Sequence, residues 1–167
     1  MSDIHALDDG RQACIRRIRH DDADALRGFI KALSPRTRRA RFLEQINEPS
    51  DALIGRLVDV DHANDEAFVA VDAADPSCLV GVARYAVDNH PTEGEIAVTV
   101  MDDWQGSGLD RALMQPLMQA ARANGLTSMI SIDPANHHPM RELAQALGFT
   151  TGPDPDDSTQ VIHRLQL

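Results

Sequence analysis

The segment that most constrains the fold is a β-branched run followed by a glycine-rich turn and a long stretch of periodic apolar residues. The run covers residues 95–100, the turn contains Gln105-Gly106-Ser107-Gly108, and the stretch closes at Asn124-Gly125. β-Branched residues favour a strand inside a sheet, and apolar residues at four-residue spacing favour a helix. The order therefore predicts a strand, a turn and a helix, which we expect Pro116 to kink.

A glycine-rich turn at the start of a helix is a place where an anion can bind. The first helical turn offers unpaired backbone N–H groups and a partial positive charge, and glycines allow a phosphate to approach closely. The dinucleotide fingerprint needs a third glycine after Gly106 and Gly108, and the Gly-Lys-Ser/Thr of an ATP-binding loop is absent. The turn indicates a phosphate-bearing ligand of another class, or a turn that only redirects the chain.

The remaining periodicities predict an α/β fold in a single domain, residues 1–167. An Asp9-Gly10 turn between two strand-like runs predicts an N-terminal hairpin, with residues 1–10 as its arm. Capping residues and apolar faces predict helices after Asp21 and Asp22, over 34–42, from Ser50, after the glycine-rich turn, and from Pro139 to Gly148. Strands are predicted at 66–71, 78–85, 95–100, 128–132 and 160–165, with a turn at Asp75-Pro76. A helix between two of them requires a parallel pair in an otherwise antiparallel sheet.

The composition limits the classes of partner that the protein is expected to bind. The net charge of −10 disfavours nucleic acid and favours cationic ligands such as amines, although it also serves plain solubility. No apolar run reaches the roughly 20 residues of a membrane span, and the N-terminus lacks a signal-peptide pattern. Cys14 and Cys78 are expected to be buried free thiols, so we expect a cytoplasmic protein without a membrane partner. A homodimer is one oligomeric state that the sequence leaves open.

The stretch Asp102-Asp103-Trp104-Gln105-Gly106-Ser107-Gly108-Leu109 resembles the acetyl-CoA motif of the GNAT superfamily of N-acetyltransferases, Gln/Arg-x-x-Gly-x-Gly/Ala. The likeness covers nearly the whole chain. It includes Ile15-Arg16-Arg17-Ile18, Asp21-Asp22-Ala23, Leu33-Ser34-Pro35, Arg41-Phe42, Gly81-Val82-Ala83-Arg84-Tyr85, Pro139-Met140 and Leu147-Gly148-Phe149. These segments look like the GNAT domain of bacterial protein lysine acetyltransferases. The resemblance implies a mostly antiparallel sheet with a splayed parallel pair and helices on both faces.

The resemblance also implies roles for individual residues. The backbone of Val98, Thr99 and Val100 would pair with the pantetheine arm of acetyl-CoA, the co-substrate. The pyrophosphate would be wrapped by the N–H groups of Gln105, Gly106, Ser107, Gly108, Leu109, Asp110 and Arg111. Glu95 occupies the position of this branch's general base. Independently, a protonated amine cannot attack a thioester, so a carboxylate near the splay is a sensible proton acceptor. The alternative is that Glu95 only faces solvent at the end of the strand. In that case Glu93 or His90 is the candidate base.

Two departures from the family pattern stand out. Asp110 replaces the last Gly/Ala of the motif; its carboxylate suits a helix N-terminus, yet a like charge about 5 Å from the pyrophosphate costs about 1–3 kcal/mol. The family's asparagine before the last helix falls on His137, with Asn136 one place earlier, and the resemblance implies that these two positions also bind the cofactor. Many members protonate the leaving thiolate with a tyrosine where this chain has Ala144. Two alternatives remain for this chain: water is the general acid, or the thiolate leaves unprotonated.

Other candidate sites carry weaker signals. His137-His138 lacks a third ligand, so we expect no metal. Four arginines over 36–41 form either a solvated helix face or a contact to the cofactor's 3′-phosphate or an acidic partner. The sequence thus predicts acetyl transfer from acetyl-CoA to a primary amine, of a protein lysine or a small molecule, by direct attack in a ternary complex. A non-catalytic acyl-CoA sensor and a scaffold that binds no CoA are the alternatives.

Overall fold

A computed structural model describes residues 3–42 and 48–167 of the chain. Its strands are β1 (Asp3–Ala6), β2 (Gln12–Arg17), β3 (Asp65–Asp72), β4 (Asp75–Val87), β5 (Glu93–Val100), β6 (Ser128–Pro134), β7 (Thr150–Asp154) and β8 (Asp157–Gln166). Its α-helices are α1 (Ala23–Ala32), α2 (Pro35–Phe42), α3 (Asp51–Val58), α4 (Leu109–Ala123) and α5 (His138–Leu147). Two short 3₁₀ turns, η1 (His20–Asp22) and η2 (Asp102–Trp104), precede α1 and the glycine-rich turn.

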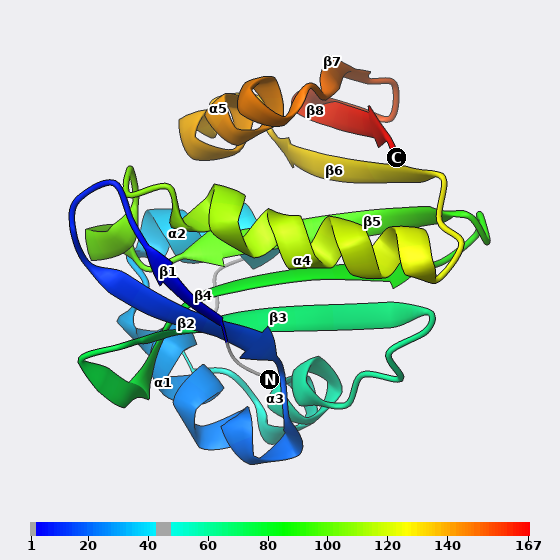
Figure 1. Ribbon diagram of the computed structural model, residues 1–167. Coiled ribbons are helices and arrows are strands. Elements are labelled where there is room, and N and C mark those ends of the chain that lie inside the picture. Colours follow the sequence, from blue (N-terminus) through cyan, green and yellow to red (C-terminus); the bar gives the residue numbers. More distant parts are fainter. Residues whose placement is uncertain (1–2, 43–47) are drawn as a thin grey trace.

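The strands form one sheet in the order β1-β2-β3-β4-β5-β6-β8-β7. Every neighbouring pair is antiparallel except β5 and β6, which are parallel because α4 crosses between them. Figure 1 shows α4 over one face of the sheet and α1 and α3 on the other side. The α/β class, the mixed sheet and the single parallel pair predicted from the sequence are therefore confirmed.

Two apolar cores, one on each face, hold the helices to the sheet. Alternating residues of β3 separate them: Phe68 and Ala70 face the core under α4 and α5, whereas Val69 faces the core under α1 and α3. This alternation follows from the two-residue period of a strand. The spacing of Leu113 and Leu117 aims one face of α4 into its core, and Pro116 is accommodated inside the helix.

Capping residues explain where several helices begin and end. Ser50 accepts a hydrogen bond from the Leu53 N–H (3.1 Å), and Ser34 accepts one from the Thr37 N–H (3.2 Å), as an N-cap residue should. Gly125 and Gly148 follow α4 and α5 at φ of +84° and +83°. The left-handed conformation that ends a helix costs glycine no steric strain. The starts of α2 and α3 and the ends of α4 and α5 were predictable for this reason.

Several local expectations were wrong. Asp75 and Pro76 begin β4 rather than forming the turn before it, and the strand β7 was not anticipated. Cys14 and Cys78 are free but only half-buried. Asp22 does not cap α1; its side chain instead accepts from the Arg19 N–H and from Arg16. The hairpin predicted for the N-terminus is present as β1 and β2, and both strands are part of the single sheet.

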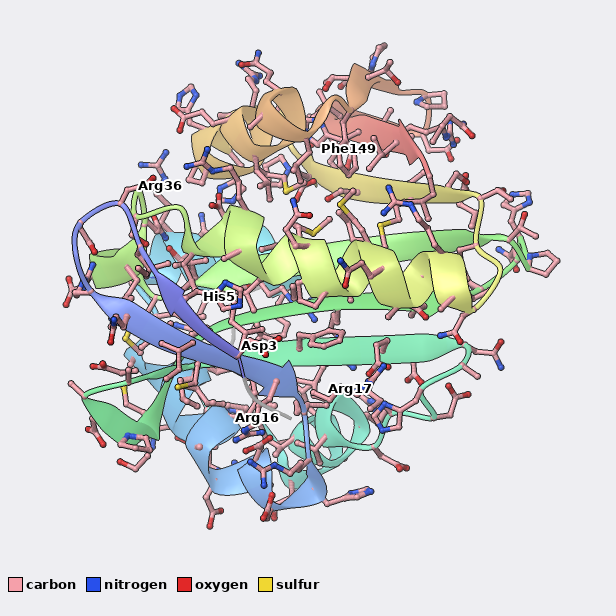
Figure 2. All side chains as sticks on the ribbon, in the orientation of Figure 1. Asp3, His5, Arg16, Arg17, Arg36 and Phe149 are labelled. Atoms are coloured by element: carbon pink, nitrogen blue, oxygen red, sulfur yellow. The ribbon has the colours of Figure 1, made fainter. Side chains whose placement is uncertain are left out.

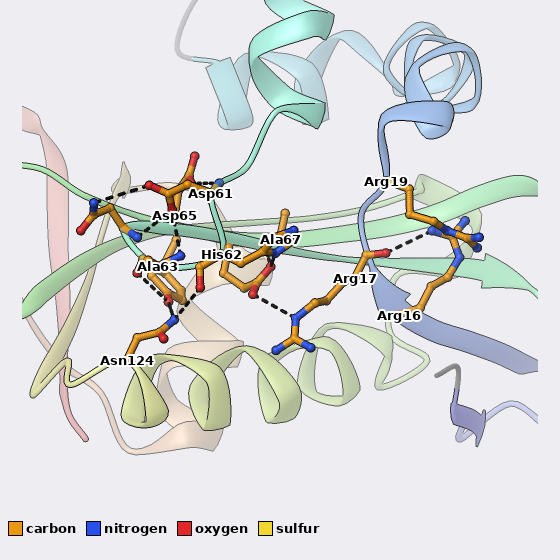
Figure 3. A network of polar contacts seen from close by, with 12 residues as sticks. Arg16, Arg17, Arg19, Asp61, His62, Ala63, Asp65, Ala67 and Asn124 are labelled. Carbon is orange, nitrogen blue, oxygen red and sulfur yellow. Dashed lines mark hydrogen bonds and ion pairs between the residues drawn. The ribbon is translucent and has the colours of Figure 1, made fainter.

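A polar network ties the end of α4 to the start of β3, far from the glycine-rich turn (Figure 3). The carboxylate of Glu66, fully buried, accepts from Arg17 Nε (3.0 Å) and faces His62 Nδ1 (2.8 Å). Asn124 donates to the Tyr85 hydroxyl (2.7 Å) and to the His62 carbonyl (3.1 Å).

None of the helices in the described part of the chain has the length and apolar character that a membrane span requires.

Candidate active site

The parallel pair β5–β6 opens into a cleft. Its register runs only from Glu93 opposite Ser128 to Glu95 opposite Ile130, although β5 continues to Val100 and β6 to Pro134. β5 stays paired with β4 along this length, so its other edge faces the space between the diverging strands. A cavity of about 610 Å³ lies there, bordered by β5, β6, α2, α5 and the glycine-rich turn. This volume suits a small-molecule ligand.

The cofactor-binding residues predicted from the motif gather at one end of this cavity. Its wall includes Val98, Thr99, Val100, Gln105, Gly106, Gly108, Asp110 and Arg111. Gly106 and Gly108 have φ of +78° and +85°, a left-handed conformation that glycine adopts without steric strain, and neither residue covers the backbone there with a side chain of its own. The side chains of Ser107 and Leu109 are buried away from the cavity: Ser107 Oγ donates to the Trp104 carbonyl (2.5 Å), and Leu109 joins the core.

Asp110 turns its carboxylate toward its own helix terminus. Oδ1 accepts from the Arg111 N–H at 2.8 Å, one of the N–H groups that the motif would offer to a pyrophosphate. Burial raises the pKa of Asp110, against the lowering effects of this hydrogen bond and of the Arg111 charge. The residue thus lines the cavity and also interacts with the helix N-terminus, so both readings of its role have a structural basis.

Among the three candidate bases, Glu95 has the position that the chemistry requires. Its side chain is exposed and lines the cavity at the point where the strands part. Glu93 accepts from Ser128 Oγ (2.9 Å) and lies 3.5 Å from Arg164 Nε, on the paired part of β5. His90 is exposed in the turn before β5 and does not border the cavity. The geometry therefore favours Glu95, whose role as base stays a prediction.

The α5 side of the cavity carries polar groups that the sequence did not single out. Asp133, at the end of β6, accepts a short hydrogen bond from Ser131 and lies 4.0 Å from the buried His163. Burial raises the pKa of Asp133, opposed by Ser131, His137 and Arg41. The sequence did contain one signal for Asp133. It is an acidic residue directly after the 128–132 strand, at the carboxyl end of a parallel pair, where ligands bind in α/β sheets.

His137 lines the cavity, whereas Asn136 is exposed and does not border it. Burial lowers the pKa of His137, with Asp133 opposing the shift. A neutral imidazole at the start of α5 therefore stands near the carboxylate of Asp133 at neutral pH. Within residues 3–42 and 48–167, no group of three His, Cys, Asp or Glu side chains is arranged to hold a metal ion.

The helix α2 closes the cavity from the opposite side. Asp102 of η2 accepts from the Ser34 N–H (3.0 Å) and from Thr37 Oγ1 (3.0 Å), which fastens the start of α2 to the segment before the glycine-rich turn. The arginines of this helix differ in their surroundings. Arg39 is exposed, and Figure 2 shows Arg36 projecting at the periphery of the molecule, whereas Arg41 lines the cavity. The helix face is therefore not uniformly solvated.

Comparison with known proteins matches this chain to one family. The family model described as "Acetyltransferase (GNAT) family" matches residues 21–149. The chain is 48% identical to "Acetyltransferase PA5475" of Pseudomonas aeruginosa over 165 residues, covering 98% of this chain and 89% of that protein. The chain therefore belongs to the acetyltransferase (GNAT) family, whose members use acetyl-CoA.

Solved structures agree with this assignment at the level of the fold. The crystal structure of the GNAT domain of S. lividans PAT superposes with a TM-score of 0.90 at 22% identity, covering 99% of this chain and 97% of that one. The structure of yncA from Salmonella typhimurium, a putative acetyltransferase with its cofactor acetyl-CoA, gives a TM-score of 0.74 at 20% identity, with 93% and 94% covered. The resemblance to GNAT domains noted from the motif is confirmed.

Proposed function

We propose that the protein is an N-acetyltransferase that transfers the acetyl group of acetyl-CoA to a primary amine by direct attack. The observation that carries the proposal is one cavity, at the splay of β5 and β6, which Glu95 and the glycine-rich turn both line. A catalytic carboxylate and a phosphate-binding turn thereby face the same space. Acetyl-CoA supplies the acetyl group as a thioester.

The residues at the cavity fit the elongated, anionic shape of acetyl-CoA. The free edge of β5 at Val98, Thr99 and Val100 offers backbone donors and acceptors to the amide groups of a pantetheine arm, as strand addition does. The N–H groups from Gln105 to Arg111 surround the start of α4, where the helix dipole favours a pyrophosphate. The yncA structure, which holds acetyl-CoA on a similar fold, supports acetyl-CoA as the ligand.

Glu95 acts as the proton acceptor in this proposal. The amine must lose a proton before its lone pair can form the C–N bond, and the C–S bond breaks as that bond forms. A carboxylate at the point where the strands part receives that proton directly or through a water molecule. The two half-buried cysteines do not line the cavity, which supports direct attack rather than a covalent relay.

Replacing Glu95 with glutamine tests the proposal. We expect kcat to fall about 10²–10⁴-fold with little change in CoA affinity, because Gln preserves the shape but cannot accept a proton. The acidic limb of the pH–rate profile should flatten. Glu93→Gln is the matched control on the same strand, and its kcat should stay near that of the wild type.

The measurement is CoA release with a panel of amines, beside calorimetric titration of CoA. An E95Q variant within threefold of the wild type would move the base elsewhere. CoA binding without turnover of any amine would favour the non-catalytic sensor, a role that the acidic Asp110 at the turn supports. Absence of CoA binding at millimolar concentration would remove both functions.

A further inference from the structure

Two half-buried arginines lie together beside the proposed acceptor end of the cleft. Arg41 of α2 and Arg84 of β4 line a small cavity of about 20 Å³ on the α1 side of the sheet, together with Thr99. Arg41 and Thr99 also line the large cavity. Burial and the neighbouring Arg84 lower the pKa of Arg41 to about 10, and burial lowers the pKa of Arg84. Since the Arg41 pKa stays well above neutral pH, two positive charges lie near each other at the wall of the small cavity.

Few of the polar atoms in this cluster have protein partners. Arg84 Nη1 donates to the Leu57 carbonyl at 3.2 Å. Within the described parts of the chain, Arg41 stacks over the Phe42 ring at 4.7 Å without a hydrogen bond or ion pair. Thr99 Oγ1 is buried without a hydrogen-bond partner. A guanidinium carries five N–H donors, and most of those of Arg41 and Arg84 have no protein partner among the described residues. Thr99 Oγ1 adds a polar atom whose burial without a partner is unfavourable. The cluster therefore has the composition of an anion-binding site.

The charges around the cluster make the cleft complementary to a zwitterion. Glu95 and Asp133 are the carboxylates whose charges reach Arg41, and both border the large cavity. Glu95 faces the amine in the proposed function, so the adjacent guanidinium is free to take a negative group on the same molecule. A planar guanidinium matches a carboxylate in two parallel hydrogen bonds.

We propose that Arg41, supported by Arg84 and Thr99, binds a carboxylate of the acceptor, so that the preferred acceptors carry both a primary amine and a carboxylate. The inference rests on the proposed function, since it names the acceptor class of the same site. Arg41 then acts as a specificity residue that contacts substrate. A purely structural role, in which Arg41 only packs on Phe42, predicts no preference between acceptors.

The test uses amines that differ only in the carboxylate. The probes are lysine and cadaverine, tyrosine and tyramine, and histidine and histamine, with lysinamide as the analogue of lysine whose carboxylate is replaced by a neutral amide. For pairs that turn over, the wild-type enzyme should show kcat/KM about 10–100-fold higher for the carboxylated member, mainly through KM, as expected for one charge-assisted contact. Lysinamide should behave like cadaverine.

The variant Arg41→Gln should lose most of that preference, and Arg41→Lys should recover part of it because it restores the charge without the planar fork. Arg39→Gln, on the exposed side of the same helix, is the matched control and should keep the preference. The CoA-induced rise in melting temperature reports folding of each variant. If Arg41→Gln does not fold, the acceptor preference of Arg84→Gln and the comparison of acceptor pairs with the wild type test the inference instead.

Equal kcat/KM values within each wild-type pair would overturn the inference, while leaving acetyl transfer established. An Arg41→Gln variant that lowers both members of a pair by the same factor would overturn it too, and would assign Arg41 a structural role. If the protein binds CoA but turns over no amine, the proposed function is refuted. The inference about the acceptor is then refuted as well, because it rests on that function.

Discussion

At the scale of single residues, Asp110 is the side chain that most sets this site apart from the GNAT motif. Its carboxylate accepts the Arg111 N–H at the start of α4 and lines the cavity where a pyrophosphate would lie. An acid there is favourable for the helix terminus but repels an anionic ligand, and the two effects act on different observables. The first concerns stability, and the second concerns CoA affinity.

The substitution Asp110→Asn separates them. Asn keeps the size but removes the charge, so CoA should bind about 5–100-fold more tightly, and the gain should shrink as salt screens the repulsion. Because burial raises the pKa of Asp110, wild-type affinity should rise as the pH falls toward that raised pKa and the carboxyl becomes neutral. The Asn variant should lack this component of the pH dependence.

Calorimetric titration of CoA at two salt concentrations and across pH 5–8, a range chosen to lie above the usual Asp pKa of about 4, measures both effects. Asp103→Asn, an exposed carboxylate of η2, controls for nonspecific charge. An unchanged dissociation constant for Asp110→Asn at low salt would show that the carboxylate does not face the cofactor.

Local chemistry made part of the site predictable from sequence. The turn at Gly106 and Gly108 needs residues that tolerate positive φ, so it was recognisable from the sequence, whereas Glu95 was singled out mainly by the resemblance to GNAT domains. Arg41 and Asp133 were not assigned to the site, because their position depends on how α2 and β6 pack in three dimensions. Neither packing leaves a short-range pattern in the sequence.

At the scale of elements, the β1–β2 hairpin is fastened to the glycine-rich turn. The Asp8 N–H donates to the Ser107 carbonyl (2.9 Å), and the Asp8 carboxylate pairs with Arg111 (2.9 Å). Arg11 donates to the Asp103 carbonyl (2.8 Å) and lies 3.9 Å over the Trp104 ring. The hairpin therefore holds the Arg111 side chain beside the start of α4.

Asp8→Asn should release the Arg111 guanidinium toward the cofactor. We expect CoA to bind about 2–5-fold more tightly at low salt, a modest gain because the ion pair is half exposed and such pairs contribute about 0–1 kcal/mol. Titration calorimetry measures the gain, and Asp3→Asn, in β1 of the same hairpin and away from its turn, is the control. Weaker binding would show instead that Asp8 orients Arg111 for the ligand.

Element prediction succeeded where capping residues act locally and failed where pairing is long-range. Ser34, Ser50, Gly125 and Gly148 mark helix ends through their own hydrogen bonds or backbone conformation. The strand β7 contains Gly152 and Pro153, residues that usually disfavour strands, and it forms only because β8 pairs with it at the sheet edge.

At the scale of the whole molecule, stability must come from outside the cleft, because β5 and β6 form no ladder pairs with each other beyond Glu95. One compensating contact fastens η1 and α1 to the sheet. Arg16 of β2 donates two hydrogen bonds of 2.8 Å to Asp22, and both side chains are largely buried. Burial alone would raise the pKa of Asp22, but the hydrogen bonds from Arg16 and the Arg19 N–H hold it below its usual value.

This contact predicts a pH-dependent stability. Asp22→Asn should lower the free energy of unfolding at pH 7 by about 2–4 kcal/mol, because it leaves the charge of Arg16 unpaired in a buried place. The corresponding fall in melting temperature is about 5–15 °C for a chain of this size. Since the folded pKa of Asp22 is lowered, its contribution is fully present above the unfolded pKa of about 4 and is lost as the pH falls through the folded value.

Thermal unfolding of the wild type and the variant at pH 7, 4 and about 2.5, spanning the unfolded Asp pKa, measures the difference directly. The gap between the two melting temperatures should narrow as the wild type loses the ionised carboxylate. Asp9→Asn removes a carboxylate whose pair with Arg11 is exposed, so it should hardly change stability at any of these pH values. A gap that stays constant down to the lowest pH would mean that Asp22 stabilises the fold through its shape and neutral hydrogen bonds rather than through its charge.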